Sequence, residues 1–473
     1  MQKNKETLPQ FYTLIVVFFF WGFVAASNDI LIPVFKEHLH LEQWQSQMVS
    51  FAFYVAYSIG SIIYMIISKF LGRDIINRIG YKNGLSLGLI ISAVGTLLFY
   101  PAATTASFGL MLTGLFIVGL GFSLQQTVAN PLAILLGNPS KGSQRLSLAG
   151  GINNIGTTLG PLIVSFAIFG SVASSNSAVA NIDSVKTPYL ILGAAFLIVA
   201  VIFKFSSLPD RHGLEELEEQ NKIEHDTKKS VLSYPHLVLG MIGIFVYVGV
   251  EVSTASNLPE FMRQHLHITT DKIAPFVSLF WASLMIGRWT SSVGAMDLKK
   301  NFKTVLNFVL PYVAFGFFLL VNKIADHDVT PFYVYAFVIL ILIGADILSK
   351  GNPARQLFIF SLCGIAALTT GILADGMVSV YAFISVGLFC STLWPCIFTL
   401  AITGLGKHTN EGSSFLIMMI MGGGFISLLQ GYLAGNNLLG IQYSYLTGIV
   451  CFGYLAFYAW KVKRIFKAEG ISL

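Results

Sequence analysis

The chain has 473 residues, of which 55% are hydrophobic and only 11% are charged, and its mean hydropathy is +0.72. This apolar content is too high for a soluble core of this length, so the composition excludes a soluble globular protein. The formal net charge of +6 does not indicate nucleic acid as a partner, because the placement of the basic residues follows membrane orientation.

Long apolar runs follow one another along the chain, and each is a candidate membrane span. A helix needs about 20 mainly apolar residues to cross a bilayer. The sequence therefore predicts an all-α, polytopic membrane protein with fourteen transmembrane helices. In chain order they cover approximately residues 11–34, 46–68, 84–102, 108–136, 146–170, 187–206, 237–258, 273–293, 304–322, 331–348, 355–374, 376–403, 413–434 and 440–460.

Two of these runs contain an acid well inside the expected span. Asp29 lies in the first run and Glu251 in the seventh. An ionisable group at membrane depth usually faces a polar cavity or a proton path, because its charge is costly against lipid. We interpret Asp29 and Glu251 as proton-coupling residues. Asp346 in the tenth run lies beside Lys350, so we expect this pair to sit near the headgroups, outside the transport path.

Amide side chains also interrupt the runs, and polar groups in hydrocarbon need partners. We expect them to converge on one wet central space, although each amide taken singly could equally hold two helices together. Amides bond neighbouring hydroxyls of a polyhydroxylated substrate, and an indole can stack on a sugar ring. The candidate substrate-binding residues are Asn28, Gln126, Asn130, Asn153, Asn154, Asn257, Trp394 and Gln430.

The basic residues are distributed unequally between the two sides of the expected membrane. Of the 29 Lys and Arg residues, 24 fall on the side of the amino terminus and 5 on the other side. Cytoplasmic loops carry the excess of Lys and Arg. We therefore predict a multi-pass protein of the inner, cytoplasmic membrane with both termini in the cytoplasm.

One long polar stretch divides six spans from eight, and a weak internal repeat explains the imbalance. Gly72 matches Gly287 at an offset of 287 − 72 = 215, whereas Pro131 matches Pro395 at 395 − 131 = 264. The difference, 264 − 215 = 49, is the length of two helices with their loops, so we expect an inserted helical hairpin in the second half. The predicted domains are a six-helix bundle at 1–206, a cytoplasmic linker at 207–234, and a second bundle at 235–473 with the hairpin at about 304–352.

Several motifs, taken together, resemble the fucose:proton symporter family of the major facilitator superfamily. They are Trp21-Gly22 with Ser27-Asn28-Asp29-Ile30-Leu31-Ile32-Pro33, Val128-Ala129-Asn130-Pro131, Arg145-Leu146-Ser147-Leu148-Ala149, Thr187-Pro188-Tyr189, Ile286-Gly287-Arg288, and Gly412-Ser413-Ser414-Phe415 with Gly422-Gly423-Gly424. The resemblance covers nearly the whole chain except the linker and the hairpin. It implies two helical bundles around a central sugar site with alternating access.

The resemblance also implies roles for single residues. Asp29 matches the first-helix aspartate used by the L-fucose permease, and Asn153 matches a fifth-helix asparagine at its sugar site. Gln126 stands where that permease has a glutamate, and Tyr247 to Glu251 resembles the glucose/galactose branch of the family. These departures favour glucose or galactose over L-fucose, and fourteen spans depart from the usual twelve.

We therefore expect a proton-coupled monosaccharide symporter. A neutral sugar accumulates only with a co-ion, and a protonatable carboxylate in a cavity can carry one. Alternatives are sodium coupling with Asp29 as an ion ligand, a permease for L-fucose or another sugar, and a membrane sugar sensor that does not transport. No zinc motif or Ser/His constellation indicates an enzyme, and we expect no cofactor or metal. The expected partners are the sugar and the lipid bilayer, and the expected state is a monomer.

Overall fold

The computed structural model describes residues 7–38, 43–72, 75–169, 186–206, 208, 230–268, 270–435 and 438–470. Side chains are described for most of these residues. The side chains of residues 25–51, 161–162 and 164–169 and a few others lie outside the description. The described part is built from helices, and its single β contact is the bridge between Thr7 and Gly137. The all-α fold expected from the sequence is confirmed.

The described residues of the first half form eight α-helices. They are α1 (Gln10–His38), α2 (Gln43–Phe70), α3 (Ile75–Ile79), α4 (Tyr81–Leu97), α5 (Phe99–Thr104), α6 (Phe108–Leu135), α7 (Gly142–Phe169) and α8 (Lys186–Lys204). The expected linker lies outside the described residues, apart from Leu208 and the residues from 230 onward.

The second half contains more helices than the first. They are α10 (Pro235–Leu266), α11 (Thr270–Ser292), α12 (Lys300–Ile324), α13 (Tyr335–Ser349), α14 (Pro353–Leu373), α15 (Gly376–Cys390), α16 (Leu393–Ile402), α17 (Thr409–Met418), α18 (Gly422–Leu433), α19 (Gly440–Ser444) and α20 (Leu446–Ala468). Short 3₁₀ turns, among them η4 (Val293–Ala295), connect several of them.

The helices account for every span expected from the sequence. Eleven helical segments of the described chain are long and apolar enough to cross a membrane. The three remaining expected spans, the first, fifth and eighth, coincide with α1, α7 and α11, which are 29, 28 and 23 residues long. Together they give 11 + 3 = 14 segments of membrane-spanning length.

Local sequence signals set the boundary between α13 and α14. Lys350 and Gly351 adopt left-handed backbone conformations, with φ of 53° and 68°, and end α13. The side chain of Asn352 then accepts a hydrogen bond from the backbone N–H of Arg355 at 2.9 Å, and Pro353 occupies the first turn of α14. A cap followed by proline is a typical helix start, so the chain reverses here within a few residues.

Glycine allows the closest helix pairs to form. A Cβ atom at Gly22 of α1 would lie 1.9 Å from the carbonyl oxygen of Asn153 in α7. A Cβ atom at Gly422 of α18 would lie 2.1 Å from the carbonyl oxygen of Phe245 in α10. Both helix pairs therefore pack backbone against backbone, as small residues permit in membrane proteins. The two pairs occupy equivalent places in the predicted repeat.

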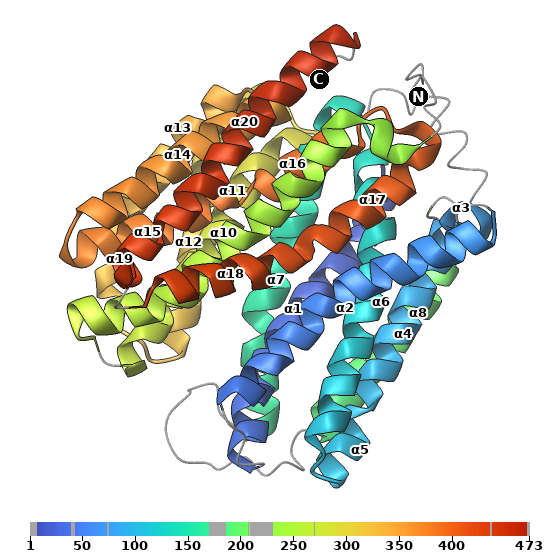
Figure 1. Ribbon diagram of the computed structural model, residues 1–473, viewed down its shortest axis with the longest axis horizontal. Helices are drawn as coiled ribbons and strands as arrows, with labels where there is room; N and C mark the ends of the chain where they lie inside the picture. The colour runs from blue at the N-terminus through green and yellow to red at the C-terminus, as the bar shows by residue number, and fades with distance from the viewer. Residues whose placement is uncertain are drawn as a thin grey trace.

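The two halves form two helical bundles that meet mainly at one end (Figure 1). Helix α1 begins and α20 ends at this same end, which we call the termini end. Across the junction, α7 packs against α11 and α16, and α17 packs against α2 and α6. Toward the opposite end the bundles diverge, with α5 on one side and α19 on the other. Gln442 of α19 donates to the backbone oxygen of Ile372, so the end of α14 lies there as well.

The helices α12 and α13 lie at the edge of the second bundle. The first packs on α11, and the second packs on α14 and α15. Large apolar side chains on both helices are exposed, including Phe302, Val305, Phe337 and Leu348. Such side chains are suited to contact with lipid. The inserted origin of this hairpin stays a prediction.

Candidate functional site

Glu251 lies in the middle of α10 and is the centre of a polar cluster. Its carboxylate accepts a hydrogen bond from the hydroxyl of Tyr247, one helical turn earlier. Tyr247 is buried, and its ring lies 6.3 Å from the indole of Trp394 in α16, centroid to centroid. Glu251 also interacts electrostatically with Arg288 of α11. Glu251 thus has interaction partners on α10 and α11, and Trp394 of α16 lies next to the first of them, Tyr247.

Arg288 connects this cluster to the first bundle. Its Nε donates to the backbone oxygen of Ser391 at 3.1 Å, between α15 and α16. Its Nη1 donates to Oδ1 of Asn154, in α7, at 2.8 Å. Because a planar guanidinium holds two acceptors in fixed directions, Arg288 ties the two bundles together beside Glu251.

The first bundle contributes polar groups from α1, α2, α6 and α7. Gln126 Nε2 donates to the hydroxyl of Tyr57 at 3.0 Å, and Asn153 Nδ2 donates to the backbone oxygen of Phe18 at 2.9 Å. Asn130 is buried, with 1% of its surface exposed. These contacts join neighbouring helices, which is the structural role that each amide could have in addition to binding a substrate.

Two candidates, Asn28 and Asp29, lie on α1. The backbone of both residues is helical, but their side chains lie outside the described residues. Their roles in substrate binding and proton coupling stay predictions.

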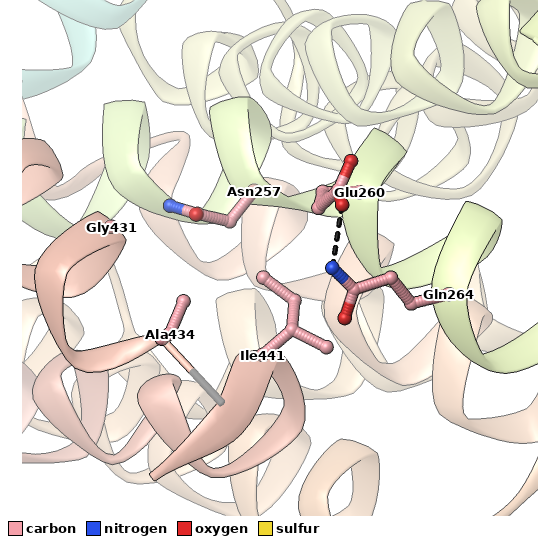
Figure 2. A pocket seen from close by; sticks show the side chains of 7 residues that line it. Asn257, Glu260, Gln264, Gly431, Ala434 and Ile441 are labelled. Atoms are coloured by element: carbon pink, nitrogen blue, oxygen red, sulfur yellow. Dashed lines mark hydrogen bonds between the residues drawn. The ribbon is translucent and has the colours of Figure 1, made fainter. Parts of the chain in front are cut away.

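The contacts of Asn257 and Gln430 do not join them to the cluster around Glu251. Asn257 lies six residues beyond Glu251 and therefore about 120° away around α10. It lines a surface cavity of about 320 Å³ together with Glu260, Gln264 and residues of α18 and α19 (Figure 2). Gln430 is fully buried and donates to the hydroxyl of Ser444 at 3.4 Å.

Further hydrogen bonds join the bundles between the middle of the molecule and the termini end. On the α11 side, Trp289 Nε1 donates to the backbone oxygen of Gly151 at 3.2 Å. On the α17 side, the Tyr81 hydroxyl donates to Asn410 Oδ1 at 2.5 Å, and Ser413 Oγ donates to the Thr127 oxygen at 3.0 Å. These bonds close the termini end.

The sequence analysis did not assign Arg288, Tyr247 or Tyr57 to the site. Arg288 appeared only as part of a repeated motif, although an arginine inside the eighth apolar run is as unusual as an acid. The two tyrosines carry no such signal, because buried tyrosine is common in apolar helices.

Comparison with known proteins decides the family. Residues 13–349 match the Major Facilitator Superfamily. The chain belongs to this superfamily. It is 35% identical to a glucose/galactose transporter of Brucella abortus, over 94% of the chain and 92% of that protein. It is 31% identical to a putative glucose/galactose transporter of Helicobacter pylori, over 98% of both chains.

More distant relatives agree with this assignment. An L-fucose-proton symporter of Escherichia coli is 26% identical over 97% of the chain and 94% of that protein. The crystal structure of the transporter FucP in the outward conformation superposes with a TM-score of 0.72, at 24% identity, over 97% of the chain and 99% of FucP. The major facilitator fold expected from the motifs is confirmed, and the chain is a transport protein of the membrane.

Proposed function

We propose that the protein carries a hexose, glucose or galactose, across the cell membrane together with a proton by alternating access. Similarity over nearly the whole chain to two transporters named for glucose and galactose supports this substrate class. The observation that carries the proposal is that Glu251 is bonded to Tyr247, whose ring lies 6.3 Å from Trp394, and interacts with Arg288, which bonds the first bundle.

The chemistry of the junction suits a neutral, polyhydroxylated ligand. On the side of the second bundle, the Glu251 carboxylate can accept hydroxyl protons, and the Trp394 ring can cover an apolar sugar face. On the side of the first bundle, Gln126 and Tyr57 offer an amide and a hydroxyl. A sugar held between both groups binds best at one relative position of the bundles, which is the requirement for alternating access.

We base the proposed proton coupling on the electrostatic interaction between Glu251 and Arg288. An ionised Glu251 attracts Arg288, and Arg288 is at the same time bonded to Asn154 of the other bundle. Protonation of Glu251 removes this attraction and so alters the balance of contacts that close the termini end. Asp29, which matches the coupling aspartate of the family, is proposed as the proton carrier. Glu251 then serves as the sugar acceptor or as a second titrating group.

We propose that the termini end faces the cytoplasm, and the excess of basic residues on the side of the amino terminus supports this orientation. In that orientation the closed end faces the cytoplasm, and the structure corresponds to an outward-facing state. We propose that the protein works as a monomer, because each chain contains both bundles and the whole junction.

Uptake by proteoliposomes tests the function. Labelled glucose, galactose and L-fucose are offered under a pH gradient, a sodium gradient, or neither. We expect accumulation of glucose or galactose only with the interior alkaline. Accumulation driven by sodium alone would replace the proton by sodium, and preferred uptake of L-fucose would change the substrate. Sugar binding without uptake of any of the three would indicate a sensor.

A further inference from the structure

The hairpin formed by α12 and α13 contains an acid that the proposed transport cycle does not use. Asp346 lies near the end of α13 and was expected to pair with Lys350 at the headgroups. The structure shows a different partner. Asp346 Oδ1 accepts a hydrogen bond from Nε2 of Gln356, in α14, at 2.9 Å, whereas Lys350 is exposed. Among the described residues, Asp346 and Lys350 do not form the expected ion pair.

Gln356 is the centre of a buried bridge between four helices. Only 1% of its surface is exposed. Besides Asp346, its Nε2 donates to the hydroxyl of Ser291, in α11, at 3.1 Å. Its Oε1 accepts from the thiol of Cys396, in α16, at 3.5 Å. A primary amide has two N–H donors, so Asp346 and Ser291 together use both and fix the orientation of the amide.

The bridge reaches the same end of α11 that contacts the first bundle. Ser291 is two residues beyond Trp289, and it therefore lies about 160° away around the helix. Trp289 bonds Gly151 of the first bundle, and Arg288 bonds Asn154. The end of α11 is thus held by two sets of contacts, to the first bundle through Arg288 and Trp289 and to the Gln356 bridge through Ser291.

The turn that ends the hairpin also touches the first bundle. A Cβ atom at Gly351 would lie 2.6 Å from Nε2 of Gln144, in α7. A Cβ atom at Gly294, just after α11, would lie 2.2 Å from the same amide. Gln144 is buried, so the turn after α13 and the turn after α11 rest on one side chain of the opposite bundle.

We propose that Asp346 is a positioning residue for closure of the termini end. Through Gln356 and Ser291 it holds α11 in the place from which Trp289 and Arg288 reach the first bundle, and the hairpin acts as a brace for this helix. The inference rests on the proposed alternating access. In this proposal the hairpin influences how often the termini end is closed or open, and it does so without contacting the sugar.

Removal of the acceptor at position 346 frees one Gln356 donor inside the bundle. A buried donor without a partner is costly, and the amide can turn away from Ser291 to find another acceptor. Closure of the termini end then loses the contact that holds α11 through Ser291. The equilibrium should shift toward the state in which this end opens and the opposite end closes.

Distance measurement between two spin labels tests the proposal without sugar or transport. Thr105, after α5, and Leu373, at the end of α14, are exposed at the diverging ends of the two bundles. Labels at these two positions are far apart when the diverging ends are open and close together when they are closed. The labelled protein without further substitutions should show mainly the long distance. We expect Asp346→Leu, Gln356→Leu and Ser291→Ala each to lower the ratio of long to short distances about 5- to 30-fold. Asp346→Asn keeps an acceptor oxygen and should stay within about twofold.

Two glycine variants provide a matched pair. Gly351 and Gly376 both have left-handed backbones, with φ of 68° and 65°, but a Cβ atom at Gly376 meets nothing within 4 Å. We expect Gly351→Ala to shift the distances and Gly376→Ala to leave them unchanged.

An unchanged distance distribution in Gln356→Leu and Ser291→Ala would overturn the proposal, as would equal shifts in Asp346→Asn and Asp346→Leu. A single distance in every variant would overturn both this proposal and alternating access. If the variants show the expected distance shifts but the protein transports no hexose, the role of Asp346 is supported and only the proposed substrate is refuted.

Discussion

Arg288 Nη1 donates to Asn154 Oδ1 at 2.8 Å, and this bond joins α11 of the second bundle to α7 of the first. The same guanidinium bonds the backbone oxygen of Ser391 and interacts with the charge of Glu251. One side chain therefore connects the central acid with the contact between the bundles.

Replacement of Arg288 by lysine should impair exchange strongly. One ammonium group cannot reproduce the planar fork that bonds Ser391 and Asn154 together, and a hydrogen bond to a charged group contributes about 1.5–3 kcal/mol. We expect hexose counterflow in proteoliposomes to fall at least about 10-fold for Arg288→Lys. Arg355→Lys, at an exposed arginine of α14, is the control and should retain full counterflow. Equal activity of both variants would contradict the assigned role.

Neutral variants of the two acids should separate sugar exchange from proton-driven accumulation. Asp29→Asn and Glu251→Gln imitate the protonated carboxyl groups, so the carrier can bind and exchange sugar but cannot release a proton. We expect Asp29→Asn to keep counterflow and to lose accumulation under a pH gradient. Glu251→Gln should lose accumulation as well if Glu251 is the second titrating group, and should weaken sugar binding if it is only an acceptor.

Counterflow and accumulation must be measured on the same vesicles, with protein amounts matched by quantitative blotting. Full accumulation by Asp29→Asn would refute its role as the proton carrier. Full accumulation by both single variants would remove the carboxylate mechanism altogether.

Replacement of glycine by alanine should have different effects on stability at two positions of the glycine triplet that begins α18. A Cβ atom at Gly422 would lie 2.1 Å from the carbonyl oxygen of Phe245, whereas a Cβ atom at Gly424 meets nothing within 4 Å. We expect Gly422→Ala to destabilise the protein by about 1–3 kcal/mol through overpacking. Gly424→Ala should be neutral or stabilising by up to about 1 kcal/mol, because alanine favours the helix. Thermal unfolding of the purified protein in detergent measures both, and similar melting temperatures for the two variants would argue against backbone contact between α10 and α18.

Labelling of a cysteine at position 221 tests the orientation. The expected linker, which contains Asn221, should lie in the cytoplasm together with both termini. In a background with the four native cysteines replaced, Asn221→Cys should react with a membrane-impermeant maleimide only after the cells are opened. Reaction in intact cells would reverse the proposed orientation and make the observed closed end the outer one.

The sequence singled out candidate residues by their polarity within apolar runs, and the structure adds the contacts that each of them makes. Glu251 stood out because a carboxylate in an apolar run needs a reason, and the structure gives it Tyr247 and Arg288 as partners. Asn257 and Gln430 carried a weaker signal of the same kind. Their contacts lead to the surface cavity and to Ser444, because an amide is satisfied by any nearby acceptor or donor.

The sequence by itself determined the fourteen helical segments and the acids within them. Hydropathy decides this, since a segment of about 20 apolar residues is driven into a bilayer whatever its neighbours are. Tertiary structure alone decided that Asp346 bonds Gln356 and that Arg288 reaches Asn154. Helices that are apolar on nearly every face carry little pattern to fix their rotation, so packing against neighbouring helices sets the direction of each polar side chain.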